Sequence, residues 1–269
     1  MKTKNILLIV ALLCASVGAR AADAAPGPTP LLTQSADKLL QVLQSNASRK
    51  DKADACRELS VIGTSKAVPV LVGLLANEEL SDMARYALET IPSTGVNPAL
   101  RSELTKLHGR QLIGVIGSLG VRRDPDAVKP LSALLKNSDP QVAQAAARAL
   151  GNIGTAGAAR AIETALRKTA PENRLAFCDG LFRCAEAMAA KGKTRDATAL
   201  YDRLRGFKNV PDQVRAGALR GSILVRGKSG DWLLRESLAT GDEVLFDAAV
   251  RAALEMPGVR VTEILAEQL

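Results

Sequence analysis

Aromatic residues and histidine are scarce in this 269-residue sequence. Phe, Trp and Tyr together make up 3% of the residues, and the single histidine is His108. Flat stacking surfaces for nucleic-acid bases or sugars are therefore few. One histidine excludes histidine-based metal triads and most nucleophile–base pairs. No glycine-rich phosphate loop follows a strand pattern. The sequence thus predicts no catalytic, cofactor-binding or metal-binding residue.

Long hydrophobic runs are absent beyond the N-terminus. There, Lys2 and Lys4 precede an apolar run, Ile6–Val17, which is followed by Ala19-Arg20-Ala21. This order is typical of a secretory signal peptide, and the run is too short for an ordinary transmembrane helix. We expect residues 1–21 to be removed after Ala21 and the protein to be exported to the periplasm or the exterior. Lipidation at Cys14 is the alternative, although Leu13 fits that processing poorly.

Cysteine is too sparse for a disulfide framework. Without the leader and its Cys14, the sequence keeps Cys56, Cys178 and Cys184, an odd number. Cys178 and Cys184 are six residues apart on one expected helix. They would lie about 9 Å apart along its axis and on different faces, so they cannot bond without breaking the helix. We interpret all three as small buried hydrophobic residues. A redox or metal role is the alternative, and their role stays open.

The excess of basic over acidic residues is also modest. The chain has 36 basic and 28 acidic residues, a formal net charge of +8. Loss of Lys2, Lys4 and Arg20 with the leader leaves 33 basic and 28 acidic residues, a net charge of +5. This balance weakly favours an acidic partner and is not the footprint of a dedicated nucleic-acid binder. We therefore expect no nucleic-acid partner.

What the sequence does contain is a clear helical hairpin at residues 138–166. Asp139 is a good N-cap, and Pro140 follows at the first helical position. Gly154 can take the left-handed conformation that ends a helix. The apolar residues then recur at three- and four-residue spacing, first on one helix and then on a second. They are Val142, Ala145, Ala146, Ala149, Leu150 and Ile153, followed by Ile162, Ala165 and Leu166.

Weaker copies of this hairpin recur along the chain. Each copy has an apolar residue four positions before a turn residue and two more about eight and twelve positions after it. The turn residues are Gly63, Pro92, Gly120, Gly154, Gly192, Gly227 and Gly258. Each interval suits one helical hairpin, so the repeats predict an all-α solenoid of about seven stacked hairpins.

The repeated residues resemble a known family. DPQVAQAAARALGNIG followed by AIETAL is similar to a HEAT-type repeat of the short kind common in bacteria, as are DQVRAGALRG at Asp212–Gly221 and SDMARYALETI at Ser81–Ile91. The resemblance covers roughly Asp51–Leu269. It implies stacked hairpins whose second helices line a concave face. Residues Ala185–Arg205 also resemble a tetratricopeptide hairpin, so one hairpin of that type is a further possibility.

The domain organisation follows from these patterns. We expect a signal peptide at residues 1–21, a Pro/Ala/Gly linker at 22–30, an N-terminal capping helix at 31–50 and a helical repeat domain at 51–269. The last segment, VTEILAEQL, lacks the polar outer face that shields a terminal repeat. A chain that continues past Leu269, a docked partner and a self-associating end all fit this pattern.

Basic residues occupy solvent-facing positions of the expected second helices. They are Arg101, Lys129, Lys136, Arg160, Arg167, Arg195, Arg205 and Arg235. The stacked geometry would align them as a basic stripe that binds an acidic partner, which is our hypothesis for the site. Glu163, Asp202 and Glu236 interrupt the stripe, and an ordinary solvated face is the alternative.

Two further features are interpreted as structural. Trp232, the only tryptophan, stands where a core residue is expected. Asp82/Arg85 and Asp212/Arg215 lie in the opening turns of first helices. In HEAT arrays similar pairs bridge neighbouring repeats, so the resemblance implies a stabilising role for both.

The sequence therefore predicts an exported protein–protein interaction or scaffold module that binds a partner on its concave face and has no catalysis of its own. The alternative is the repeat portion of a larger multidomain exported enzyme, or a HEAT-like lyase. No residue matches such a lyase beyond the repeat itself.

Overall fold

The computed structural model describes residues 35–267, and these residues fold into helices without any strand. The predicted signal peptide and linker lie outside the described residues, so nothing structural bears on them. Within residues 35–267 no helix is long and apolar enough to cross a membrane. The predicted all-α class is confirmed.

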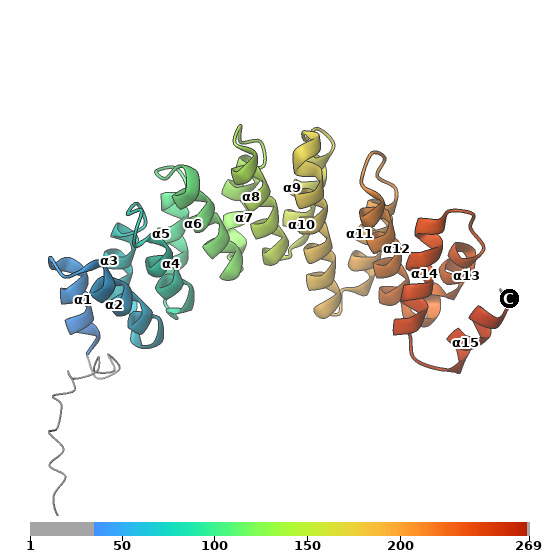
Figure 1. Cartoon of the computed structure of the whole chain (residues 1–269), viewed down its shortest axis with the longest axis horizontal. Coiled ribbons are helices and arrows are strands. Elements are labelled where there is room, and N and C mark those ends of the chain that lie inside the picture. Colours follow the sequence, from blue (N-terminus) through green and yellow to red (C-terminus); the bar gives the residue numbers. More distant parts are fainter. Residues whose placement is uncertain (1–34, 268–269) are drawn as a thin grey trace, which may run out of the picture. The chain divides into compact units, whose positions relative to one another are not determined.

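The helices follow one another as hairpins in chain order (Figure 1). The N-terminal helix α1 (Ala36–Gln44) precedes the hairpins and packs against α2. The seven hairpins of the described residues are α2 (Arg49–Ile62) with α3 (Val68–Gly73), α4 (Ser81–Thr90) with α5 (Val96–Glu103), α6 (Gly109–Val121) with α7 (Val128–Leu134), α8 (Pro140–Ile153) with α9 (Ala156–Leu166), α10 (Pro171–Ala190) with α11 (Thr194–Arg205), α12 (Asp212–Arg226) with α13 (Asp231–Leu238), and α14 (Glu243–Glu255) with α15 (Val259–Ala266). This arrangement confirms the predicted stack of about seven hairpins.

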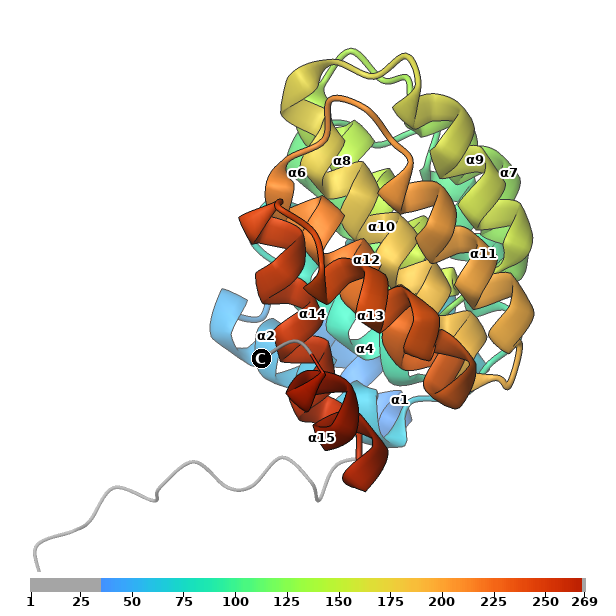
Figure 2. The ribbon, with the colours of Figure 1, turned by 90° about the vertical axis from the view of Figure 1, so that its right-hand side faces the viewer.

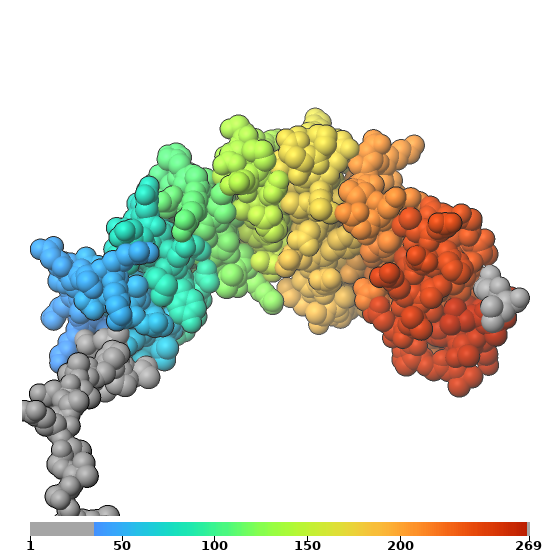
Figure 3. Space-filling model, viewed as in Figure 1, coloured from blue at the N-terminus to red at the C-terminus, as the bar shows by residue number. Residues whose placement is uncertain are grey.

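The hairpins stack so that first and second helices form separate layers. Figure 2 shows α6, α8 and α10 in one layer and α7, α9 and α11 in the other. From α2 to α10 each first helix packs on the first helices beside it, as α8 does on α6 and α10, whereas α12 packs mainly on α11 and α14. Successive hairpins of residues 35–267 touch one another along the stack in the space-filling view (Figure 3). We call the layer of second helices the second-helix layer.

The reference hairpin forms for the reasons that its sequence indicates. The carboxylate of Asp139 accepts a hydrogen bond from the Gln141 amide at 2.8 Å, and Pro140 occupies the first helical position. Gly154 ends α8 with φ 63°, in the left-handed region that suits glycine. Thr155 then caps α9, because its hydroxyl oxygen accepts from the Ala158 amide at 3.1 Å.

Small residues let the first helices approach closely. A Cβ on Gly151 of α8 would lie 2.8 Å from the Cα of Gly180 on α10, and a Cβ on Gly180 would lie 2.5 Å from the carbonyl oxygen of Ala147. A Cβ on Gly120 of α6 would lie 2.8 Å from the Cα of Ala149. These distances are too short for real carbon contacts, so the packing of α6, α8 and α10 requires glycine at these positions.

The buried apolar residues form two clusters that meet on α12. One cluster runs from Leu39 to Ala218, and the other begins at Leu219 and includes Ile223 and the buried residues of α13, α14 and α15. The helix α12 therefore contributes to both. Successive hairpins bury each other's apolar faces, as expected for a repeat array.

Arg122 holds the turn between α6 and α7 against the end of α4. Its Nη1 donates to the carbonyl oxygens of Leu88, Glu89 and Ile91 at 3.0, 3.0 and 3.1 Å. The last carbonyls of a helix have no partner within the helix. One guanidinium therefore satisfies the C-terminal carbonyls of α4, and burial lowers the pKa of Arg122.

The two Asp/Arg pairs on first helices do link neighbouring hairpins. Asp82 binds Arg85 within α4 at 2.6 Å and Arg110 of the next hairpin at 3.1 Å. Arg215 binds Asp212 within α12 at 3.1 Å and Asp242, the N-cap residue of α14, at 2.5 Å. Acidic groups at helix N-termini and basic partners from adjacent hairpins thus join the first helices at their ends.

The close contact between α8 and α10 makes a clear prediction. Replacing Gly180 with alanine will destabilise the protein by about 1–3 kcal/mol, because the added methyl group must displace the backbone of α8. Gly117 is exposed inside α6, and no atom lies within 4 Å of the place that an added methyl group would take. Replacing Gly117 with alanine will instead stabilise the protein by about 0.5–1 kcal/mol. Urea unfolding of both variants measures the difference. Equal effects of the two alanines would contradict the close-packing argument.

Candidate binding face on the second helices

Five residues of the predicted basic stripe are exposed cations without an ion-pair partner among residues 35–267. They are Lys129 on α7, Lys136 just after it, Arg160 on α9, Arg167 at the end of α9, and Arg195 on α11. Lys168, beside Arg167, is also exposed and has no ion-pair partner among residues 35–267. We call these six residues the basic face.

Three predicted stripe residues are engaged in ion pairs instead. Arg101 binds Asp124 at 2.5 Å and Asp126 at 3.5 Å. Arg205 binds Asp202 at 3.5 Å, and Arg235 binds Glu267. Asp124 is 2% exposed, so Arg101 neutralises a buried carboxylate and serves the fold. The structure thus places all eight residues on or beside second helices but leaves only the central five uncompensated.

Most cations on the first helices form ion pairs, unlike those of the basic face. Arg85, Arg110, Arg183, Arg215, Arg220 and Arg226 all form ion pairs with described carboxylates. Within the first helices, Arg148 on α8 and Arg251 on α14 are the exposed cations with no described hydrogen-bond or ion-pair partner. Uncompensated positive charge is therefore concentrated on the second-helix layer, over α7, α9 and α11.

The basic face has a regular register. Lys129 and Lys136 are seven residues apart, and so are Arg160 and Arg167. Seven residues are about two helical turns, so Arg160 and Arg167 lie on one side of α9 about 10 Å apart, whereas Lys136 lies in the turn after α7. That separation is close to the Debye length in physiological salt, about 8 Å. Neighbouring charges of the face consequently reinforce one another only moderately in solution.

The acidic residues that interrupt the stripe are mostly neutralised. Glu163 on α9 accepts a hydrogen bond from Arg203 Nε on α11 at 2.6 Å. Asp202 on α11 pairs with Arg226 Nη2 at 2.5 Å and accepts from the Ser222 hydroxyl at 2.7 Å. Of these three acids, only Glu236 on α13 is exposed without an ion pair, and Asp196, next to Arg195 on α11, is a further exposed acid without an ion pair among the described residues. The positive potential of the face is thus weakened less than the sequence indicates.

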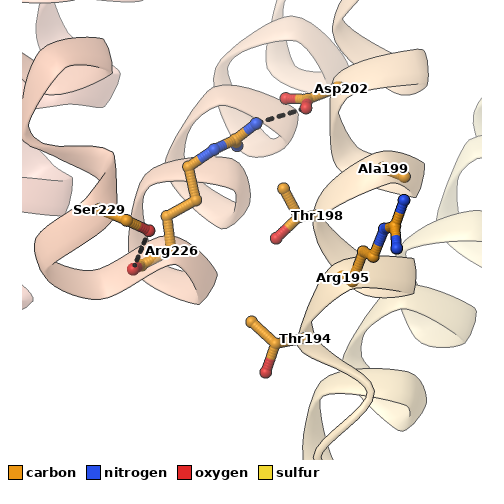
Figure 4. Close-up of a pocket in the computed structure, with 7 residues that line it drawn as sticks. All are labelled: Thr194, Arg195, Thr198, Ala199, Asp202, Arg226 and Ser229. Carbon is orange, nitrogen blue, oxygen red and sulfur yellow. Dashed lines mark hydrogen bonds and ion pairs between the residues drawn. The ribbon is translucent and has the colours of Figure 1, made fainter.

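A hollow of about 520 Å³ adjoins Arg195 (Figure 4). Its lining comes from α11 and from the turn between α12 and α13. The residues are Thr194, Arg195, Thr198, Ala199, Asp202, Arg226 and Ser229. Figure 4 shows Arg226 reaching toward Asp202, with Thr198 between the two helices and Arg195 on the α11 side. The sequence did not indicate this hollow, because its two walls are separated by the whole of α12.

Asp202, Ser222 and Arg226 form a polar network beneath the hollow. Burial raises the pKa of Asp202, but hydrogen bonds from Arg226 and Ser222 and the charges of Arg226 and Arg205 outweigh it, so the pKa lies below its ordinary value. Arg226 Nη1 also donates to the Ser222 carbonyl oxygen at 3.2 Å. The carboxylate is therefore ionised and fully engaged at neutral pH.

The prediction that Trp232 belongs to the core is wrong. Its side chain is 56% exposed, and the Arg226 guanidinium carbon lies 5.9 Å from the ring centroid, within the range of a cation–π contact. The adjacent Leu233 and Leu234 fill the core positions of α13 and are fully buried. The neighbouring leucine pair was the signal that tryptophan falls on the other side of this short helix.

The three cysteines of the described residues are free and buried, as predicted. Burial raises the pKa of Cys56 and of Cys178 to about 11 and that of Cys184 to about 12. Each is therefore a neutral thiol at physiological pH, which suits a small hydrophobic residue. Residues 35–267 contain no group of three or more potential metal ligands.

Comparison with known proteins bears on the central hairpins. Residues 97–181, from α5 to the middle of α10, match the family model of HEAT repeats. This part of the chain is therefore similar to HEAT repeats. The predicted resemblance is confirmed there, and five members of the basic face lie within the matched residues: Lys129, Lys136, Arg160, Arg167 and Lys168.

Solved structures with similar folds include the complex of CpcE and CpcF of phycocyanin lyase from Nostoc sp. PCC7120. It is 19% identical with a TM-score of 0.46, and the match covers 95% of this chain and 100% of that chain. Two engineered proteins are 22% and 23% identical, with TM-scores of 0.42 and 0.31. Their matches cover 87% and 85% of this chain and 71% and 97% of theirs. No curated protein matches the sequence.

The Asp202 network predicts a pH-dependent contribution to stability. A carboxyl whose pKa is lower in the folded state stabilises the fold above its unfolded pKa of about 4, and this stability is lost as pH falls through the folded pKa. Replacing Asp202 with asparagine will therefore lower the unfolding free energy by about 1 kcal/mol at pH 7, a value reduced for the partial exposure of the carboxylate.

The difference between wild type and this variant will shrink below about pH 4. Urea unfolding at several pH values measures it. Replacing Glu236 with glutamine, at an exposed position without an ion pair, is the control and should change stability little at any pH. A pH-independent loss in the Asp202 variant would show that the carboxylate charge does not stabilise the fold.

Proposed function

We propose that the protein is a binding scaffold whose second-helix layer takes an acidic segment of another protein. The observation that carries the proposal is the contrast between the two layers. Most first-helix arginines form ion pairs, several of which join neighbouring hairpins, and only Arg148 and Arg251 are exposed and unpaired among the described residues of the first helices. On and beside the second helices, six cations are exposed and uncompensated: Lys129, Lys136, Arg160, Arg167, Lys168 and Arg195. Cations that the fold does not use are available to a partner.

The magnitude of the effect requires several contacts at once. An exposed ion pair contributes about 0.2–1 kcal/mol, so one lysine or arginine would not hold a partner. Four or five such pairs would contribute about 2–4 kcal/mol and would also speed association with an acidic segment. The regular register of the face on α7 and α9 suits an extended chain that crosses neighbouring hairpins.

A protein is the expected partner rather than a nucleic acid. Aromatic residues make up only 3% of the chain, so base stacking has little support. The formal net charge of +8 is modest for 269 residues. Our proposal is one of binding without catalysis by the chain itself. The enzyme alternatives drawn from the sequence stay predictions.

Charge reversal on the basic face tests this function. The triple variant with Lys129, Arg160 and Arg167 each changed to glutamate should bind a fluorescently labelled octaglutamate peptide at least about tenfold more weakly than wild type, which corresponds to about 1.4 kcal/mol. Fluorescence anisotropy at low ionic strength measures the binding. Affinity should also fall as salt is added, because salt screens exposed charges.

A matched triple variant separates the basic face from net charge. Lys38 on α1, Arg148 on α8 and Arg251 on α14 are exposed cations without an ion pair among residues 35–267. Their reversal to glutamate changes the net charge by the same amount, and binding should fall far less. Equal losses in the two triple variants, or no binding of the peptide by wild type, would reject the basic face as a binding site.

We also propose that the protein works outside the cytoplasm. The support is the N-terminal sequence itself, with Lys2 and Lys4 before the apolar run and Ala19-Arg20-Ala21 after it. The mature protein isolated from its own cells should begin at Ala22, as measured by intact mass and N-terminal sequencing. A chain that starts at Met1 would contradict export by this route, and a lipid on Cys14 would show the alternative processing.

A further inference from the structure

The register of the basic face changes in the fifth hairpin. Arg160 lies six residues after the turn residue Gly154, and Lys129 holds the same place in the preceding hairpin, three residues later because of the longer turn at Arg122–Asp126. Six residues after Gly192, the corresponding position of α11 is Thr198. A short hydroxyl side chain thus replaces a long cation at this point of the row.

The hollow described above opens at that position. Thr198 contributes to its lining, and so does Arg195, which lies one turn earlier on α11 and has no ion-pair partner among residues 35–267. The hydroxyl groups of Thr194 and Thr198 make no hydrogen bond to another described residue. The hollow therefore offers one free guanidinium and two free hydroxyl donors. The hollow, of about 520 Å³, is an open depression of the surface, which suits one side chain of an extended segment rather than an enclosed small molecule.

The polar network at the hollow is only partly buried. It lies beside α12, where one apolar cluster ends with Ala218 and the other begins with Leu219. Ser222 is fully buried there, the Arg226 side chain is 15% exposed and the Asp202 side chain is 38% exposed. A partly exposed ion pair contributes up to about 1 kcal/mol to stability. The network therefore stabilises the junction of the two clusters modestly, and Asp202 and Arg226 also line the hollow.

The network also prepares the hollow for a negative group. The Asp202 carboxylate, which would repel an acidic ligand, is already occupied by Arg226 and Ser222. Arg226 in turn faces the ring of Trp232, whose side chain is more than half exposed. A ligand in the hollow would meet Arg195, and Trp232 does not line the hollow but contacts Arg226, which does.

We propose that this hollow is the anchor pocket of the basic face and takes one aspartate or glutamate side chain of the bound acidic segment. The carboxylate binds Arg195 and the hydroxyl groups of Thr194 and Thr198, and the next residue of the segment lies toward Trp232. This inference rests on the proposed function, since it names the point at which the acidic segment is fixed on the second-helix layer.

The single tryptophan makes the pocket directly measurable. Octaglutamate contains no tryptophan, so its titration should change the emission of Trp232 as binding saturates. Replacing Thr198 with arginine fills the hollow and adds a positive charge to the row. We expect this T198R variant to bind octaglutamate at least about fivefold more weakly and to lose the change in Trp232 emission. If the face attracted the peptide by charge alone, the added arginine would instead make the variant bind more tightly.

A second variant keeps the test independent of steric damage. Replacing Arg195 with glutamine should weaken binding about threefold to fivefold, whereas replacing Arg251 with glutamine removes the same charge from α14 and should leave binding unchanged. Circular dichroism and thermal unfolding verify that all variants remain folded. If T198R also unfolds, the Arg195 and Arg251 pair still decides the result.

The outcomes separate the pocket from the face. Unchanged or tighter binding by T198R with the emission change retained, or equal effects of the Arg195 and Arg251 changes, would overturn the anchor pocket while leaving the basic face in place. Absence of octaglutamate binding by wild type would overturn both. Weaker binding by T198R and by the Arg195 variant, with the Arg251 control unaffected, supports the pocket.

Discussion

The close approach of the first helices is the constraint on which the rest of the structure depends. Gly151 and Gly180 bring α8 and α10 so near that no side chain fits between their backbones, and Gly120 brings α6 equally close to Ala149. A hairpin of two short helices cannot bury its apolar face alone, so each needs such a neighbour. Tight packing of one layer in turn fixes where the second helices emerge. The second helices pack on the first helices, as α11 does on α10 and α12, so their positions follow from this packing.

That constraint also divides the charged residues by role. Closely packed helix ends bring Asp82 to Arg110 and Asp242 to Arg215, so the first layer uses its arginines to join hairpins. The second helices α7 and α9 have few acidic neighbours, and their cations stay uncompensated. Exposed ion pairs contribute little to stability. The cost of leaving Lys129 or Arg160 unpaired is therefore small for the fold, while the gain for recognition of an acidic segment is cumulative.

Helix positions and turns were predictable from the sequence because they depend on local signals. Asp139, Pro140 and Gly154 act within one helix, and the apolar spacing of the hairpin needs no knowledge of its neighbours. The pairing state of the stripe was not predictable. The partners of Arg101 and Arg235 come from later turns and helices. Trp232 was misplaced for a related reason, since Leu233 and Leu234 compete for the same core and only three-dimensional packing decides between them.

The junction on α12 shows how one departure from the repeat creates a new surface. The fifth hairpin has Asp202 where a purely basic face would have no acid, and an uncompensated carboxylate there would oppose an acidic ligand. Arg226 from the next hairpin neutralises it, and Ser222 completes its hydrogen bonds. Because Thr198 is short, the same region is hollow rather than filled by a lysine or arginine. Arg226 is paired with Asp202 and contacts Trp232, so Arg195 is the cation of the hollow's lining that has no ion-pair partner among the described residues. In our proposal the basic face therefore ends at a hollow with one available guanidinium rather than at one more exposed cation of the row.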